Sequence, residues 1–405
     1  MNKKILAIPA LTLCFSAIAL NNRAFALEDC SSVTDATLLE TCLAQGGEIT
    51  LGSDIIITKN LEIIKNTTLN LNEHSVTAGA GSFANGIRGM FTVKHGAKAI
   101  INGAGTISTG LNPAVYAAIS MTVKNTPKAS ADIPAELVVN NATVEGYYYG
   151  IAGNGTRADN DYRSNTSIEV NNSTISGLNT ADSIGIFHPQ EGILKITGNS
   201  LISGNTGLGL KGGSLILENG TIKGFGDYVA SPGLYNNGMN MSGAALAVES
   251  NTGYVNNVKI SILGGKLVSD NGVAFKEYRT NGLAEEPIKS LSIEGGNFIS
   301  ATDKDVFELS EDFTLTNFIS GGTFSGEIAS EFLAEGFYSE EVGGEVIIKP
   351  IESGEPEIED VPEEKAPNTG VVSKETSVIK GIGVATLLSV FVTIFSAFCL
   401  FKKEA

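Results

Sequence analysis

The chain has 405 residues, of which 42% are hydrophobic and 18% charged, so wholesale disorder is excluded and a large core is possible. It contains 47 glycines but only 11 prolines, which excludes a collagen-like chain. Its formal net charge of -17 repels phosphate backbones, and we therefore expect no nucleic-acid partner.

The first 26 residues have the pattern of a secretory signal peptide. Lys3 and Lys4 supply the charged start, and a mainly apolar stretch follows over residues 5–20. Alanines stand at the last and third-last positions of the segment, which predicts cleavage after Ala26. The alternative is an N-terminal membrane anchor, for which this stretch is shorter than the ~20 residues of a membrane-spanning helix.

The segment after the signal, residues 27–47, has the features of a cap. Cys30 and Cys42 lie in it, and two cysteines in an exported chain predict a disulfide bond. The run Ser32-Val-Thr-Asp35 resembles a capping box with Asp in place of Glu or Gln. It predicts a short amphipathic helix over residues 36–45, which the disulfide would hold over the first part of the next domain.

A recurring unit fills residues 48–350. It consists of an alternating apolar strand, then Asn or Gly, a small or polar residue, one apolar residue and often Gly. The second apolar position anchors each copy, and the anchors are Val76, Ile107, Val144, Ile175, Ile202, Ile222, Leu267, Phe298 and Phe324. Their spacings run from 20 to 45 residues, and self-similarity at such periods is typical of repeat architectures.

The shortest spacing shows the unit without insertions. Within it, Leu194 and Ile196 fall on one face of a strand and Lys195 and Thr197 on the other. Three short strands per coil cannot form a compact sheet alone, but stacked coils bury their apolar faces together. We therefore predict an all-β fold, a right-handed parallel β-helix, with a β-sandwich as the alternative.

The other spacings indicate the same coil with insertions. Asn and Gly between the strands supply the left-handed backbone that tight corners require. The longest spacing, before Leu267, predicts an additional coil around residues 244–250. Residues 331–338 and 345–349 predict a closing cap, and residues 351–365 form an acidic stalk.

Three stretches resemble pectate-lyase-like bacterial surface β-helices. They are the run from Leu39 through Gly46-Gly47 to Leu69-Asn-Leu-Asn, the phrase Ile186-Phe-His-Pro-Gln190 and the phrase Gly321-Gly-Thr-Phe324. The resemblance covers roughly residues 30–349. It implies the β-helix fold and a surface location, and because its motifs are turns of the scaffold it implies no activity.

The C-terminus has the order of a cell-wall sorting signal, with the motif Ala366, Pro367, Asn368, Thr369 and Gly370. Residues 371–405 then hold a polar spacer, an uncharged stretch over residues 381–401 long enough to span a bilayer, and a basic tail. This order resembles the Leu-Pro-x-Thr-Gly signals read by sortases of Gram-positive-type bacteria, with Ala366 in place of Leu. The resemblance implies cleavage after Thr369 and attachment to peptidoglycan, with sortase and peptidoglycan as partners. The alternative is a single-pass membrane anchor.

Candidate binding side chains are few. In a strand, Tyr147 and Tyr149 would share one face, with Tyr148 on the other, and such a pair could stack on a sugar ring. His188 lies in a second polar cluster, on a turn with Gln190. Packing in the core or at a coil corner is the alternative for both groups.

We predict no catalytic residue, no metal site and no cofactor. A charged loop contains Arg157, Asp159, Asp161 and Arg163, whose charges compensate one another.

Two classes of function stay open. The leading one is a non-enzymatic, wall-anchored surface protein that binds a glycan or a protein, and the other is a polysaccharide lyase or glycoside hydrolase. Carboxylates from successive coils that converge in one groove, ~6.5–9.5 Å apart for an inverting hydrolase, would favour the second class.

Overall fold

The computed structural model describes residues 27–83, 88–121, 133–153, 165–232, 238–250, 254, 257–279 and 286–352. The predicted signal segment, the stalk beyond Glu352, the sorting motif and the apolar stretch 381–401 lie outside these residues. No helix within the described ranges is long and apolar enough to cross a membrane.

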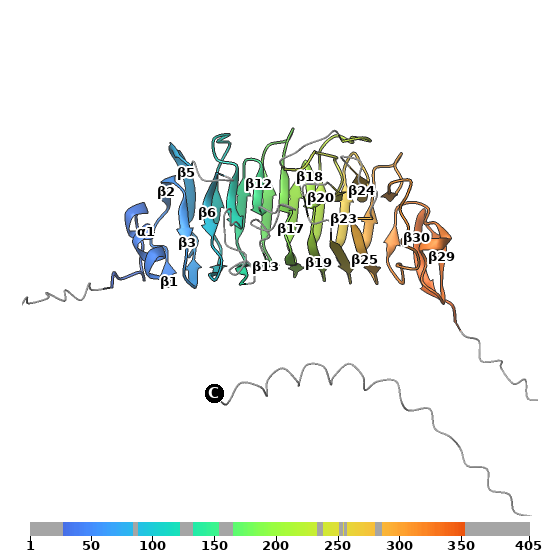
Figure 1. The fold of residues 1–405 in the computed structure, drawn as a ribbon, viewed down its shortest axis with the longest axis horizontal. Helices are drawn as coiled ribbons and strands as arrows, with labels where there is room; N and C mark the ends of the chain where they lie inside the picture. Colours follow the sequence, from blue (N-terminus) through green and yellow to red (C-terminus); the bar gives the residue numbers. More distant parts are fainter. Residues whose placement is uncertain are drawn as a thin grey trace, which may run out of the picture. The chain divides into compact units, whose positions relative to one another are not determined.

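The described chain is mostly β-strand, arranged in three sheets whose strands stack in parallel (Figure 1). In spatial order, the first sheet contains β1 (Gly47–Thr50), β4 (Thr67–Asn70), β7 (Lys98–Asn102), β10 (Ala135–Asn140), β13 (Thr166–Asn171), β16 (Gly192–Thr197), β19 (Gly213–Leu217), β22 (Val258–Ile262) and β25 (Ile288–Ile293). The second sheet contains β2 (Ile55–Lys59), β5 (Ser75–Ser82), β8 (Thr106–Ser108), β11 (Thr143–Gly146), β14 (Thr174–Gly177), β17 (Leu201–Gly204), β20 (Thr221–Gly224), β23 (Lys266–Ser269), β26 (Asn297–Ile299), β28 (Thr323–Phe324), β30 (Glu345–Pro350) and β29 (Phe337–Val342). The third sheet contains β27 (Phe307–Glu308), β24 (Phe275–Arg279), β21 (Leu246–Ser250), β18 (Thr206–Leu210), β15 (Ile184–His188), β12 (Tyr149–Gly153), β9 (Ala117–Met121), β6 (Gly89–Val93) and β3 (Leu61–Ile63).

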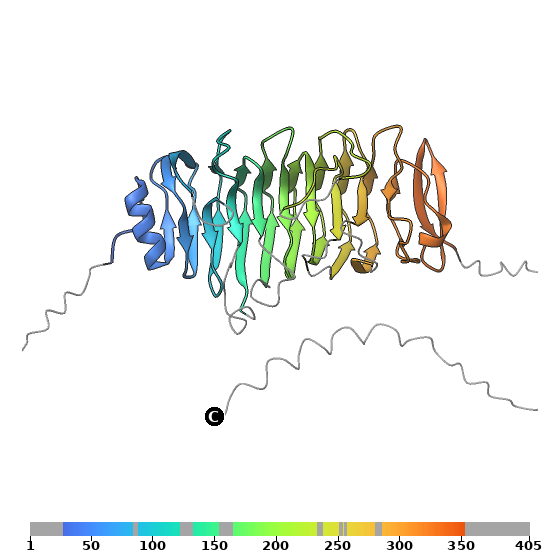
Figure 2. The same ribbon diagram turned by 45° about the horizontal axis from the view of Figure 1, so that its top comes forward.

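Each coil passes through the three sheets in turn, an arrangement consistent with the predicted parallel β-helix (Figure 2). A β-sandwich would instead pack two antiparallel sheets face to face. In β16, Leu194 and Ile196 are buried while Lys195 and Thr197 are partly exposed, which confirms the predicted alternation.

The predicted anchors form one continuous interior stack on the second sheet. The parallel register pairs Val76 with Ile107 at one end and Phe298 with Phe324 at the other, and it links every anchor between them in sequence order. All of them are buried, so the predicted register is confirmed.

The prediction of an additional coil around residues 244–250 is wrong. β20 pairs directly with β23, so Ile222 and Leu267 belong to adjacent coils. β21 is the third strand of the same coil and lies between β18 and β24. Insertions before and after β21 lengthen this coil without adding a strand to the first and second sheets.

Left-handed residues mark the corner between the first and second sheets. The backbone φ is 52° at Asn72, 55° at Asn141, 48° at Asn172 and 64° at Gly198. Asn and Gly adopt this conformation at a lower cost than other residues, which explains why they recur after the first strand of each coil.

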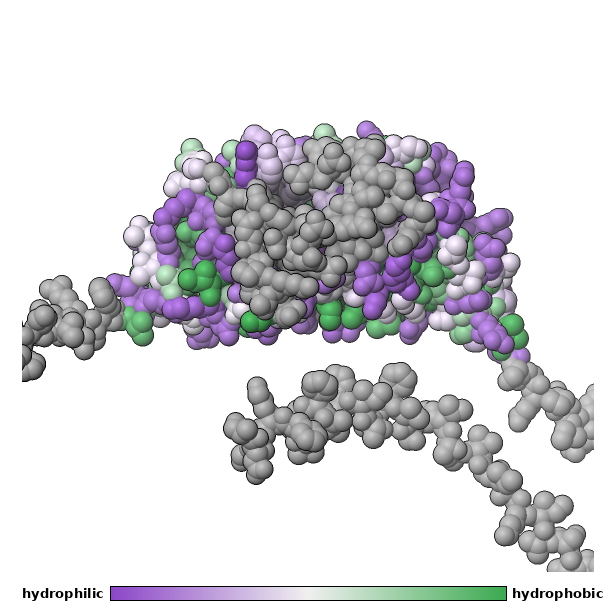
Figure 3. Space-filling view, in the orientation of Figure 1, coloured by the Kyte–Doolittle hydropathy of each residue, from purple (hydrophilic) through white to green (hydrophobic). Residues whose placement is uncertain are grey.

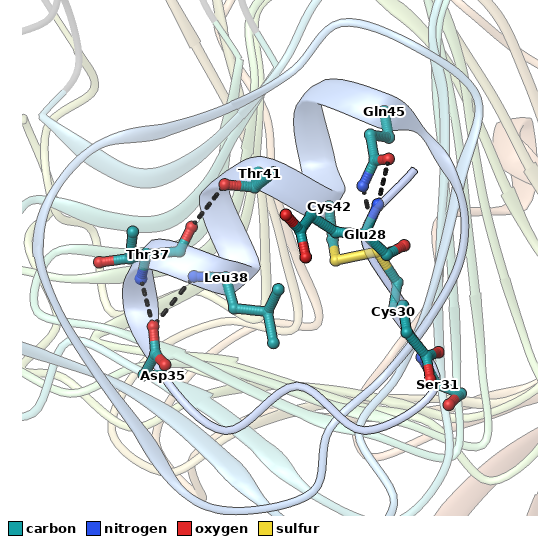
Figure 4. The surroundings of a disulfide bond; sticks show 10 residues. Glu28, Cys30, Ser31, Asp35, Thr37, Leu38, Thr41, Cys42 and Gln45 are labelled. Atoms are coloured by element: carbon teal, nitrogen blue, oxygen red, sulfur yellow. Dashed lines mark hydrogen bonds between the residues drawn. A yellow bond between two sulfur atoms is a disulfide. The ribbon is translucent and has the colours of Figure 1, made fainter. Parts of the chain in front are cut away.

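Helix α1 (Ala36–Gln45) covers the first coil and buries Leu39 and Leu43. Asp35 is its N-cap, because one carboxylate oxygen accepts from the backbone N–H groups of Thr37 and Leu38, both at 2.9 Å (Figure 4). The predicted capping box on Ser32 is therefore wrong. Its position is unsuitable because the next residue, Val33, already forms a parallel bridge to Leu51 in extended backbone.

A disulfide ties the start of the described chain to this helix. Cys30 and Cys42 are bonded, with 5.8 Å between their Cα atoms (Figure 4). The side-chain oxygen of Gln45 also accepts from the backbone N–H of Glu28 at 2.9 Å. The helix and the segment before it therefore form one cap, held by the predicted disulfide.

The other end of the stack closes with an antiparallel hairpin. β30 pairs antiparallel with both β28 and β29, and a short 3-10 helix, η1 (Ser330–Phe332), lies between β28 and β29 in the chain. The outermost strand β29 carries Glu340 and Glu341. Charged side chains on an edge strand oppose pairing with other chains. The hairpin contains residues 345–349 of the predicted closing cap.

Candidate functional site

The third sheet differs from the other two because both of its faces are buried. Every residue of β9, β15 and β18 is buried, whereas buried and partly exposed residues alternate along β10. A second apolar cluster covers the outer face and comprises Ala117, Ala152, Ile184, Phe187, Met239, Ala244, Ala247, Val273 and Tyr278. Met239 and Ala244 come from the insertion before β21, so inserted chain builds an environment that the coils alone would not provide.

Three side chains at the corner before the third sheet form a row across successive coils, which we call the corner row. They are Arg88, Tyr116 and Tyr148, which directly precede β6, β9 and β12. These three strands are neighbours in the third sheet. The backbone N–H of Tyr116 donates to the carbonyl of Arg88 at 2.9 Å, and that of Tyr148 to the carbonyl of Tyr116 at 3.0 Å. The spacing of the row is therefore fixed by the sheet ladder itself.

The side chains of the corner row contact one another. The Arg88 guanidinium lies 4.8 Å from the centroid of the Tyr116 ring. Tyr116 and Tyr148 meet edge to face at 5.0 Å, and Tyr148 meets Tyr147 edge to face at 4.7 Å. These three tyrosines are half-buried. The row is thus a connected aromatic surface that ends on a cation.

The predicted face-sharing of Tyr147 and Tyr149 is not observed. Tyr147 and Tyr148 lie in the bend between β11 and β12, where strand alternation does not apply, and only Tyr149 is in a strand. Tyr149 stacks on Phe187 at 5.7 Å in the neighbouring coil. Tyr147 therefore belongs with the corner row, and Tyr149 with the packing beside it.

A buried ion pair lies further along the sheet. The Lys211 Nζ donates to Glu249 Oε1 at 2.7 Å, and both side chains are fully buried. The Tyr278 hydroxyl donates to Glu249 Oε2 at 3.0 Å, and the Tyr254 ring lies 4.4 Å from the lysine nitrogen. Burial lowers the pKa of Lys211, against the opposing charge of Glu249, and burial raises the pKa of Tyr278 well above its ordinary value.

A second lysine attaches inserted chain to the next coil. The Lys276 Nζ pairs with Glu308 Oε1 at 2.5 Å and donates to the carbonyl of Ala230 at 2.9 Å. The Tyr228 ring lies 5.1 Å from Lys276 and 4.6 Å from Lys304. Burial lowers the pKa of Lys276. Together with Lys211, this contact fastens the inserted segments onto the sheet.

The same strand carries an ion pair on its other face. Glu277 Oε1 accepts from Arg279 at 3.3 Å, and its second oxygen accepts from the backbone N–H of Ser310 at 2.9 Å. Arg279 also pairs with Glu286 at 3.1 Å and with Asp312. A buried pair of this kind needs all its partners, because removing one leaves an uncompensated charge.

These pairings bear on the choice between binding and catalysis. The buried carboxylates of Glu249 and Glu277 each bond a lysine or arginine, and so does Glu308, which is partly exposed. A general acid or base must instead reach the substrate. Within the described ranges, no group of three or more His, Cys, Asp or Glu residues is placed to hold a metal ion.

His188 is fully buried, at the end of β15. Its Nδ1 lies 3.2 Å from the carbonyl of Gly212 and its Nε2 lies 3.4 Å from the hydroxyl of Thr166. Gln190 donates to the same hydroxyl at 3.0 Å and is also fully buried. Burial lowers the pKa of His188 to about 4, so the ring is neutral at physiological pH. The structure therefore places His188, predicted as a possible ligand-binding residue, in the interior, and its role in ligand binding stays a prediction.

The charged loop predicted at Arg157, Asp159, Asp161 and Arg163 lies outside the described residues. Comparisons with protein-family models, with curated proteins and with solved structures found no match.

Sequence reasoning did not single out the corner row beyond Tyr147 and Tyr148. Arg88 and Tyr116 are separated from Tyr148 by insertions of unequal length, so no fixed period connects them. The sequence did contain one signal that could have found them, since Arg88 and Tyr116 each directly precede the third strand of their coil. Aligning the coils on that strand would have placed them in one row.

Proposed function

We propose that the chain is an exported protein that a sortase joins to peptidoglycan, and that its right-handed parallel β-helix binds a glycan or a protein at the cell surface without catalysis. The order of the motif ending in Thr369 and Gly370, the uncharged stretch 381–401 and the basic tail carries this proposal. The pectate-lyase-like phrases of the sequence support the same location.

On the described face that is visible in Figure 3, the distribution of residues supports display rather than assembly through one large apolar face. Figure 3 shows hydrophilic residues over much of the visible described face, with apolar residues in separate patches. Scattered apolar residues are ordinary on soluble domains, whereas a large continuous patch marks an interface. A net charge of -17 also opposes self-association.

The ion pairing of three glutamate side chains favours binding over catalysis. Glu249, Glu277 and Glu308 lie on neighbouring coils, but each is paired with a lysine or arginine, and Glu277 lies on the opposite face of the sheet from the other two. Separating any of these pairs would leave a charge without its partner. The lyase or hydrolase alternative would need an acid or base outside this set.

Cell fractionation of a sortase-positive Gram-positive host tests the proposal. The full-length chain should enter the wall fraction and end at Thr369, and Thr369→Ala should stay in the membrane fraction. Deleting residues 381–405 should release the protein into the medium. Thr376→Ala, in the spacer beyond the motif, is the matched control and should be sorted normally. Complete extraction of the wild type by detergent, with residues 381–401 still attached, would show a simple membrane anchor.

A further inference from the structure

We propose that the corner row of Arg88, Tyr116 and Tyr148, extended by Tyr147, is a binding site for an uncharged oligosaccharide that lies along the solenoid. This inference rests on the proposed surface-binding function and names its ligand class and its residues. The row provides what a sugar requires: aromatic rings for the C–H faces and N–H or O–H groups for the hydroxyls.

The row repeats along the solenoid. The residues of the row occupy nearly equivalent positions in three successive coils, and adjacent coils are about 4.8 Å apart, close to the length of one pyranose ring. A ladder of similar side chains at a constant spacing matches a ligand that itself repeats. A protein ligand would more often be held by a compact cluster of hot-spot residues, surrounded by contacts that keep water away from them.

The row is rigid. The backbone bonds between Arg88, Tyr116 and Tyr148 fix the row, and edge-to-face contacts at 5.0 and 4.7 Å hold the tyrosine rings. Tyrosines that are already ordered lose little conformational freedom on binding. Half-burial leaves part of each ring at the surface, so the site exists before the ligand arrives.

The backbone of Arg88 is left-handed, with a φ of 55°. This left-handed conformation is unfavourable for a long side chain, and such strain clusters at functional positions. Here it accompanies a guanidinium placed 4.8 Å from the Tyr116 ring centroid. A guanidinium carries five N–H donors, so an arginine beside an aromatic ring can also donate hydrogen bonds to a ligand.

Charge argues for an uncharged sugar. The chain carries a net charge of -17, which repels polyuronates and other anionic polymers at long range. A single arginine at one end of the row does not offset that charge. The site therefore selects neutral chains, whose affinity depends on stacking and on hydroxyl contacts rather than on salt.

Titration calorimetry of the purified full-length chain with cellohexaose, chitohexaose and oligogalacturonate tests the inference. We expect one neutral hexaose to bind, with affinity that rises from the monosaccharide to about the trisaccharide and then levels off, because three coils contribute. Tyr116→Ala and Tyr148→Ala should each weaken binding at least tenfold. Tyr338→Ala, at an exposed tyrosine of β29, is the matched control and should bind as the wild type does.

Two results would overturn the inference. Binding that is unchanged in the Tyr116→Ala and Tyr148→Ala variants, with their thermal unfolding also unchanged, would place the ligand elsewhere. If neither neutral hexaose gave a binding signal, the row would not be an oligosaccharide site, and a protein would be its occupant. Wall attachment of the same variants is measured separately, so that failure of this inference and failure of the proposed function are distinguished.

Discussion

At the scale of single residues, His188 should make stability depend on pH. Its pKa is about 4 in the folded protein, because burial disfavours the charged ring, against about 6.5 in an unfolded chain. Between these values the unfolded state binds the proton and the folded state does not. The free energy of unfolding should therefore be highest above pH 6.5 and fall by about 3 kcal/mol as the pH drops to 4.

Urea denaturation of the full-length chain at several pH values measures this slope. His188→Asn keeps a polar side chain near Thr166 and Gly212 but cannot titrate, so it should lose the part of the slope that belongs to the histidine. His74→Asn changes a partly exposed histidine and is the matched control. Equal slopes in the wild type and in His188→Asn would show that the buried ring does not titrate as argued.

At the scale of the strand, β17 gives a matched pair of neighbouring residues. Ile202 points into the interior between Ile175 and Ile222, while Leu201 lies on the partly exposed face. Ile202→Asp would bury a carboxylate without a partner and remove an apolar side chain, at a cost of at least about 3 kcal/mol. Leu201→Asp should cost far less, and thermal unfolding of both variants measures the difference. Equal melting temperatures would contradict the assigned register.

At the scale of the cap, the disulfide should account for much of the stability of α1. The bond closes a short loop between Cys30 and Cys42, for which a contribution of about 3 kcal/mol is expected. Thiol titration of the denatured, unreduced protein secreted by cells should find neither thiol free. The double variant Cys30→Ser and Cys42→Ser should expose the helix to proteolysis first, because α1 packs on the first coil, at the end of the described stack. Two free thiols in the wild type would refute the bond.

At the scale of the whole molecule, the stacked coils were predictable from the sequence. The contacts that the insertions make on the outer face of the third sheet were not. The stack of anchors follows from a repeated pattern in which Ile202, Ile222 and their equivalents play one role. Lys211 and Glu249 are joined because insertions of irregular length bury the outer face of the third sheet, and no period specifies such lengths. The additional coil was predicted wrongly for the same reason, since length alone does not show whether inserted chain forms strands.

A solenoid whose coils are equivalent should tolerate the deletion of one complete coil. It should not tolerate a deletion that is one residue longer than a coil. Val170 aligns with Ile196 in the first sheet, so deleting residues 170–195 joins Glu169 to Ile196 and preserves the inward and outward alternation. This shortened chain should keep its β-sheet circular dichroism and unfold cooperatively at a somewhat lower temperature. Deleting residues 170–196 instead places Thr197, the last residue of the strand, at an inward position and brings the left-handed Gly198 one position early, so that the corner into the next strand is out of register with the coils on either side. That chain should aggregate or unfold without a sharp transition, and equal behaviour of the two deletions would contradict a fold held together by the register between coils.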